Sequence, residues 1–98
     1  MEKGMVEELR NYLSGQPVSR AWIFGSVARG EDREDSDVDI LVDFDAGVGL
    51  FKYSSMIEDI ENLLKKAVDL VSSTSLFPWI KDSVEHDKIL IYERKAQG

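Results

Sequence analysis

Two short apolar runs constrain the fold of this chain most. The first covers Val18–Phe24 and stops at Gly25-Ser26, and the second follows Asp37-Val38-Asp39 as far as Phe44. Both are rich in β-branched and aromatic residues, which favours strands. Because side chains alternate across a strand, Asp37 and Asp39 share one face, about 6–7 Å apart, and Val38, Ile40 and Val42 share the other. The second run therefore predicts a strand with one apolar face and one face that begins with two carboxylates.

A third aspartate, Asp69, stands between Val68 and Leu70 in another apolar run. If that run is a strand beside the second one, with its apolar side inward, Asp69 lies on the same face as Asp37 and Asp39. Three clustered carboxylates repel one another unless a cation lies between them, and such hard oxygen ligands suit Mg²⁺. The alternative is that the aspartates are solvated charges on an edge strand.

Gly25-Ser26 ends a strand where the chain would turn into a short helix. Such a turn presents free backbone N–H groups to an anion, and glycine lets a phosphate approach the backbone closely. Ser26 can donate its hydroxyl, and Arg29 could reach a phosphate or could equally pair with the acidic run 31–35. An anion site beside a metal cluster describes a site for a metal-bound nucleoside triphosphate.

Helices and strands alternate along the rest of the chain. The period of the apolar residues, with glycine and proline at the breaks, predicts one domain over residues 1–98, of mixed α/β (α+β) class, with helices packed on a small sheet. Helices are expected at residues 2–14, 26–29 and about 50–66, and near Pro78, covering Phe77, Ile80 and Val84. Strands are expected at residues 18–24, 37–44, 67–71 and 88–92, a turn at 45–49, and a frayed tail at 94–98.

Composition excludes several classes of function. The net charge is -7, with 19 acidic and 12 basic residues, which disfavours a long nucleic acid as the main partner. There is no cysteine, so neither disulfides nor thiolate chemistry are available. No apolar run approaches the roughly 20 residues of a membrane span, and no signal peptide is evident. We expect a soluble, cytoplasmic domain, and the composition leaves homo-oligomerisation open.

Two rival motifs fail at required positions. The spacing of Gly25 and Gly30 matches the glycines of a P-loop, but Glu31 and Asp32 stand where lysine and serine or threonine are required. The aspartates at 35, 37 and 39 imitate the start of a calcium loop, but Ile40 occupies its glycine position and Ala46 its final glutamate position.

The motif set as a whole resembles the signature of the DNA polymerase beta superfamily of nucleotidyltransferases. It consists of Gly25-Ser26, ten further residues, Asp37-x-Asp39 and a later Asp69 in a strand. Within that superfamily, Gly-Ser-Val-Ala-Arg-Gly and Ser-Asp-Val-Asp-Ile-Leu-Val look like the minimal nucleotidyltransferase (MNT) group. The resemblance implies the nucleotidyltransferase fold, with Gly25 and Ser26 binding the triphosphate. It implies that Asp37 and Asp39 hold two Mg²⁺ ions, while Asp69 completes one metal site and helps to deprotonate the incoming hydroxyl.

The same resemblance implies a reaction and a partner. A nucleoside monophosphate, AMP from ATP, would be transferred to a hydroxyl, and the short chain needs a partner to supply it. Many MNT proteins are antitoxins of HEPN ribonuclease toxins, so a HEPN-type protein is the expected partner. The alternative is a non-catalytic antitoxin that neutralises its partner by occlusion. Modification of a small molecule or an RNA end is a weaker third hypothesis.

Overall fold

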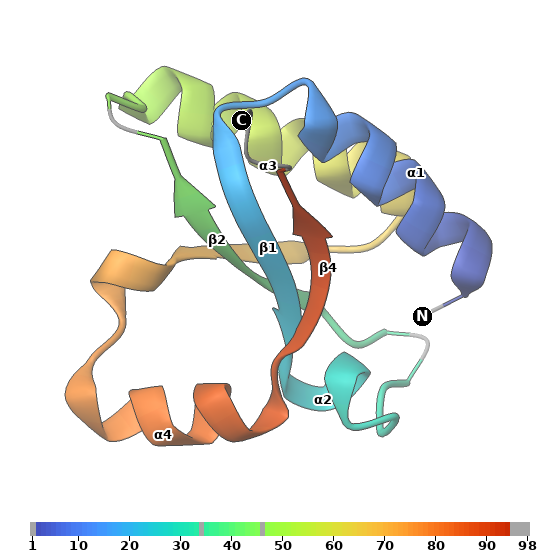
Figure 1. Cartoon of the computed structure of the whole chain (residues 1–98). Coiled ribbons are helices and arrows are strands. Elements are labelled where there is room, and N and C mark those ends of the chain that lie inside the picture. Colours follow the sequence, from blue (N-terminus) through green and yellow to red (C-terminus); the bar gives the residue numbers. More distant parts are fainter. Residues whose placement is uncertain (1, 34, 46, 95–98) are drawn as a thin grey trace.

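The computed structural model describes residues 2–33, 35–45 and 47–94, which form one mixed sheet covered by helices (Figure 1). The sheet order is β3-β2-β1-β4. β1 is antiparallel to β2 and β4, whereas β2 and β3 are parallel. The strands are β1 (Val18–Phe24), β2 (Val38–Phe44), β3 (Val68–Ser72) and β4 (Ile89–Glu93). The predicted fold class is confirmed, and each strand lies within one residue of its expected bounds.

The helices lie on two sides of the sheet. They are α1 (Lys3–Ser14), α2 (Gly25–Ala28), α3 (Leu50–Leu64) and α4 (Pro78–Asp87), with a 3-10 turn at Ser73–Ser75. α1 and α3 cover one face, and α4 lies on the opposite side of the sheet, next to α2 (Figure 1). α3 ends two residues before the predicted position, because Lys65 takes a left-handed conformation with φ of 58°.

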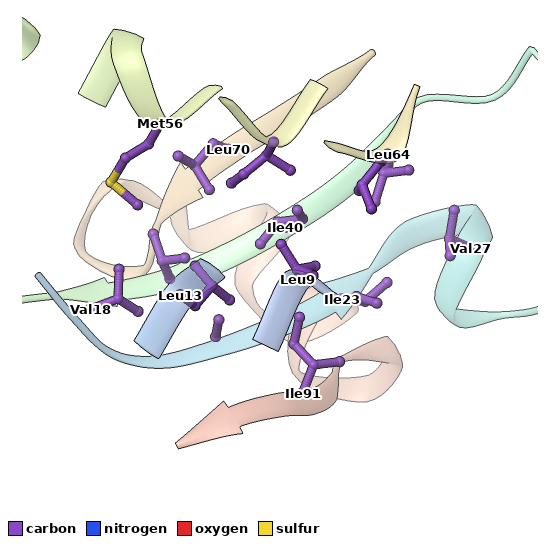
Figure 2. Close-up of a cluster of buried hydrophobic side chains, with 14 residues drawn as sticks. Leu9, Leu13, Val18, Ile23, Val27, Ile40, Met56, Leu64, Leu70 and Ile91 are labelled. Atoms are coloured by element: carbon purple, nitrogen blue, oxygen red, sulfur yellow. The ribbon is translucent and has the colours of Figure 1, made fainter. Parts of the chain in front are cut away.

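The main core lies between the sheet and the pair α1 and α3. The apolar face predicted for β2 is buried, with Val38, Ile40 and Val42 at most 1 % exposed. Leu9 and Leu13 of α1 pack onto this face, as Figure 2 shows. Their spacing of four residues puts both side chains on one side of the helix, so a helical conformation buries them together against the sheet. α3 adds Met56, Ile60 and Leu64 by the same periodicity.

Both edges of the sheet are capped by helix side chains. On β3, the Val68 N–H donates to Glu61 Oε2 (3.0 Å), and the Leu70 carbonyl accepts a hydrogen bond from the Tyr53 hydroxyl. On β4, the Ile91 carbonyl accepts from Arg10 Nε at 2.8 Å. These three backbone groups are therefore satisfied without another strand, which protects the edges against pairing.

The prediction of a frayed tail is wrong at Arg94. Its backbone N–H donates to the Ser19 carbonyl (2.8 Å), and its guanidinium pairs with Asp45 at 2.7 Å. The remainder of that predicted tail, residues 95–98, lies outside the described residues, as does Ala46 in the turn predicted after β2. Within the described part of the chain, no helix is long and apolar enough to cross a membrane.

Candidate active site

Gly25 brings the backbone at the end of β1 directly against a carboxylate of β2. It has a φ of 72°, a conformation that residues with a side chain rarely adopt. A Cβ atom at this position would overlap Asp39 Oδ2, so the close approach requires glycine. The cause is sheet register, because Phe24, the last residue of β1, lies opposite Asp39. The two halves of the sequence motif are thus in contact.

Asp69 lies next to Asp39 in the sheet. The parallel pairing of β2 and β3 places these two aspartates in register, as expected if the strands are neighbours. Asp37 directly precedes β2 and is exposed. Burial raises the pKa of Asp39, and the negative charges of Asp69 and then Asp37 raise it further, while Arg29 opposes the rise. The charges of the two other predicted carboxylates, Asp69 and Asp37, therefore both act on Asp39.

The carboxylates do not form a ready-made metal cage. Within residues 2–33, 35–45 and 47–94, no three His, Cys, Asp or Glu side chains lie close enough together to hold an ion. The chemistry of the donors nevertheless fits a hard divalent cation, because carboxylate oxygens are the ligands that such ions prefer, and the negative charges of Asp69 and Asp37 act on Asp39. A cation between them would offset that repulsion.

Ser26 and Arg29 differ in their exposure and in their contacts. Ser26 follows Gly25 in α2 and is half-buried, and its carbonyl accepts a hydrogen bond from the Glu31 N–H (2.9 Å). Arg29 is half-exposed and forms two ion pairs, one to Glu31 at 3.0 Å and one to Asp87 of α4 at 2.7 Å. The salt-bridge alternative for Arg29 is thus observed, with Asp87 as a partner that the sequence did not indicate.

A hollow of about 500 Å³ adjoins Asp69 along the outer side of β3. Its walls come from β2, β3 and the start of α3, with Phe44, Tyr53 and Leu70 among them. The rings of Phe44 and Tyr53 meet edge to face, with centroids 6.0 Å apart. Sequence reasoning placed Tyr53 only on a helix face, since its apolar spacing gives no signal of its contact with β3. Burial raises the Tyr53 pKa, and so does the Asp69 charge.

Comparison with known proteins agrees with this geometry. The family model described as "Polymerase beta, Nucleotidyltransferase" matches residues 7–97. The protein adenylyltransferase MntA of Thermococcus cleftensis is 45 % identical over 69 residues, 70 % of this chain and 70 % of MntA. The protein MJ0435 of Methanocaldococcus jannaschii is 40 % identical over 72 residues, which make up 74 % of this chain and 77 % of that protein.

Solved structures share the fold. A candidate minimal nucleotidyltransferase superimposes with a TM-score of 0.78 and 37 % identity, covering 89 % of both chains. A toxin–antitoxin complex crystallised with AMP-PNP contains a chain with a TM-score of 0.79, at 18 % identity and over 92 % of this chain and 74 % of its own length. That second likeness concerns the fold alone. Motifs, register, family match and fold agree, and the chain belongs to the Polymerase beta nucleotidyltransferase family.

Proposed function

We propose that the protein is a metal-dependent nucleotidyltransferase that transfers AMP from ATP to a hydroxyl of a protein partner. The observation that carries this proposal is the contact between Gly25 and Asp39, with Asp69 in register beside them. The contact joins a backbone site for phosphate to a set of carboxylates. The MntA relative, a named protein adenylyltransferase, supports AMP as the group and a protein as the acceptor.

Each residue has a role in this reaction. Gly25 and Ser26 bind the triphosphate, with Arg29 near enough to Asp39 to influence its charge. Asp37, Asp39 and Asp69 would hold Mg²⁺, an ion that would supply positive charge for the phosphates and would lower the pKa of the acceptor hydroxyl. Asp69 takes the hydroxyl proton. The hydroxyl oxygen then forms a bond to the α-phosphorus, the bond from that phosphorus to the bridging oxygen breaks, and pyrophosphate leaves.

The partner in this proposal is a HEPN-type toxin, so the protein is an antitoxin. Support comes from structural neighbours described as toxin–antitoxin complexes, one of them a tri-AMPylated Shewanella oneidensis HEPN toxin with an MNT antitoxin. The acidic net charge of -7 suits a partner with a basic RNA-binding surface. We place the reaction in the cytoplasm, where both partners would be made.

Labelling with α-³²P-ATP and Mg²⁺ tests the proposal, with the product of the neighbouring gene as the candidate acceptor. Wild-type protein should label the acceptor, and the Asp37→Ala, Asp39→Ala double variant should lower labelling at least a hundredfold. The matched control removes two acidic residues from the neighbouring loop, Asp32→Ala and Asp35→Ala, and should label within about twofold of wild type.

The same variants separate catalysis from occlusion. If the Asp37→Ala, Asp39→Ala variant remains folded and bound but no longer relieves the growth arrest caused by the toxin, transfer is the antitoxin mechanism. Full relief by that variant would instead assign neutralisation to occlusion. If the Asp37→Ala, Asp39→Ala variant labels the acceptor as strongly as the Asp32→Ala, Asp35→Ala control, the catalytic assignment is wrong.

A further inference from the structure

We propose that the hollow beside Asp69 on the outer side of β3 is the docking site for the acceptor-bearing segment of the protein partner. This inference rests on the proposed function and adds the route by which the acceptor arrives. It assigns that segment a neutral, largely apolar surface that surrounds its reactive hydroxyl.

Strand order fixes the side from which the acceptor comes. Gly25-Ser26 follows β1, Asp39 lies on β2, and Asp69 lies on β3, so the sheet order β3-β2-β1 spreads these groups in one direction. In phosphoryl transfer the attacking and leaving oxygens lie roughly in line on opposite sides of the phosphorus. If the leaving pyrophosphate is bound at the β1 end, the hydroxyl arrives over β3. Asp69 is the carboxylate nearest to that approach.

The structure provides a receptacle on that side. The hollow has a volume of about 500 Å³, with Asp69 among its lining residues together with Phe44, Tyr53 and Val71. Leu50 stands on its rim with 77 % of its surface exposed, and the adjacent Phe51 is 93 % exposed. Exposed large apolar side chains beside an apolar hollow are typical of a protein-docking surface.

The lining also selects the class of occupant. Asp69 is the one charged residue among the described residues that line the hollow, and none of them is lysine or arginine. A nucleic-acid end would bring its phosphates to a carboxylate without basic side chains to receive them. A neutral or apolar protein segment meets no such penalty, which favours a protein acceptor over RNA.

The capped edge of β3 determines how that segment binds. Tyr53 and Glu61 already occupy the Leu70 carbonyl and the Val68 N–H, two groups that an added strand would need. The segment therefore docks through side chains that enter the hollow and does not extend the sheet.

Steady-state transfer of AMP to the partner protein that wild type labels in the experiment above tests the docking site. Two variants obstruct it: Leu50→Lys on the rim and Ser75→Arg in the lining, both at exposed positions where folding is not at stake. Each should raise the KM for the partner at least tenfold while the KM for ATP stays within twofold. The matched control is Leu90→Lys on β4, at the opposite edge of the sheet and 47 % exposed, which should leave both constants within twofold.

Three results would contradict, respectively, the docking site, the acceptor class and the proposed function. An unchanged KM for the partner in both obstructing variants, or an equal rise in Leu90→Lys, would overturn the docking site and leave the proposed function standing. If wild-type protein labels an RNA oligonucleotide with a free 3′ hydroxyl and not the partner protein, the assigned acceptor class is wrong. If wild type labels neither, the proposed function itself fails.

Discussion

Gly25 and Gly30 share the same backbone conformation, with φ of 72° at both, yet they meet different surroundings. A Cβ at Gly25 would overlap the Asp39 carboxylate, whereas a Cβ at Gly30 would meet open space. An alanine would therefore be strained by the left-handed backbone at both positions, but only at Gly25 would it also collide with Asp39. Comparing the two alanine variants cancels the backbone strain and leaves the effect of the contact with Asp39.

Gly25→Ala should destabilise the protein more than Gly30→Ala. The left-handed conformation costs an alanine about 1–2 kcal/mol at either position. The displaced Asp39 adds about 1–3 kcal/mol at Gly25 alone, as expected for overpacking. Urea unfolding at pH 7 measures both values. Equal destabilisation by the two substitutions would mean that the contact between Gly25 and Asp39 is not formed in solution.

Asp39→Asn should stabilise the protein at neutral pH while abolishing transfer. Burial and neighbouring carboxylates raise the Asp39 pKa in the folded protein. The contribution of Asp39 to folding stability is therefore fully present below its ordinary pKa of 3.8, and it is lost as the pH rises through the raised pKa. At pH 7 the ionised side chain is therefore a cost, which asparagine removes. Solvent screening of this partly exposed group keeps the gain below about 1 kcal/mol. Thermal melting at pH 7 checks the sign, and a lower melting temperature than wild type contradicts it.

At the scale of single residues, the sequence predicted the features that depend on side chains alternating between the two faces of a strand. The shared face of the aspartates followed from strand periodicity, and the burial of Val38, Ile40 and Val42 followed with it. The ion pair of Arg29 with Asp87 joins residues 58 positions apart, and no local pattern indicates such a partner. The hydrogen bond of Tyr53 to the Leu70 carbonyl was equally hidden, because Tyr53 fits the apolar period of α3.

The Tyr53 hydroxyl caps an edge strand, so its loss acts at the scale of the element. Tyr53→Phe should cost about 1 kcal/mol, the usual net value of a hydrogen bond, by leaving the Leu70 carbonyl without this donor. It should also increase self-association, because a freed edge group can pair with another chain. Urea unfolding and analytical ultracentrifugation measure the two effects.

Tyr12→Phe is the matched control for that experiment. It removes a hydroxyl that donates to Asp59 at 2.7 Å between α1 and α3, away from the sheet edges. This variant should lose stability without associating. Association of both variants to the same degree would count against the capping role of Tyr53.

The ion pair between Arg29, the residue after α2, and Asp87 of α4 should make the packing of α4 sensitive to acid. Hydrogen bonding from Arg29, and then from His86, lowers the Asp87 pKa. The stabilisation is therefore present above the ordinary value of 3.8 and lost as pH falls through the lowered value. NMR shifts of the Val84 methyl groups should report a transition in that range. Asp87→Asn should abolish it and Asp82→Asn, in the same helix, should retain it; a transition that persists in Asp87→Asn assigns it to another group.

For the whole molecule, carboxylate repulsion at the site adds to an excess of seven negative charges. Mg²⁺ should therefore raise the melting temperature. At an Mg²⁺ concentration of ten times its Kd, the free energy of unfolding should rise by about 1.4 kcal/mol. The Asp37→Asn, Asp39→Asn variant should lose this response. The Asp32→Asn, Asp35→Asn variant, which removes the same charge, should keep it. Equal responses would assign the effect to general screening and remove the support for a metal site.

The sequence also predicted most of the architecture, because element type follows from local periodicity and from the glycine and proline positions. The pairing of β3 with β2 did not follow from these patterns. It was the condition under which Asp69 would lie beside Asp37 and Asp39. The place of β4 beside β1 at the far edge depends on contacts between residues distant in sequence, with Trp22 opposite Leu90. Such pairings are chosen by the packing of the whole chain, which local patterns do not specify.

The capped edges of the sheet have a consequence for evolution. Glu61, Tyr53 and Arg10 fix the width of the sheet from within the chain. A partner then meets a finished surface, so changes on that surface can alter which protein is recognised without disturbing strand pairing. Under the proposed function, changes on that surface would exchange one acceptor for another while the strands that carry Asp39 and Asp69 stay the same.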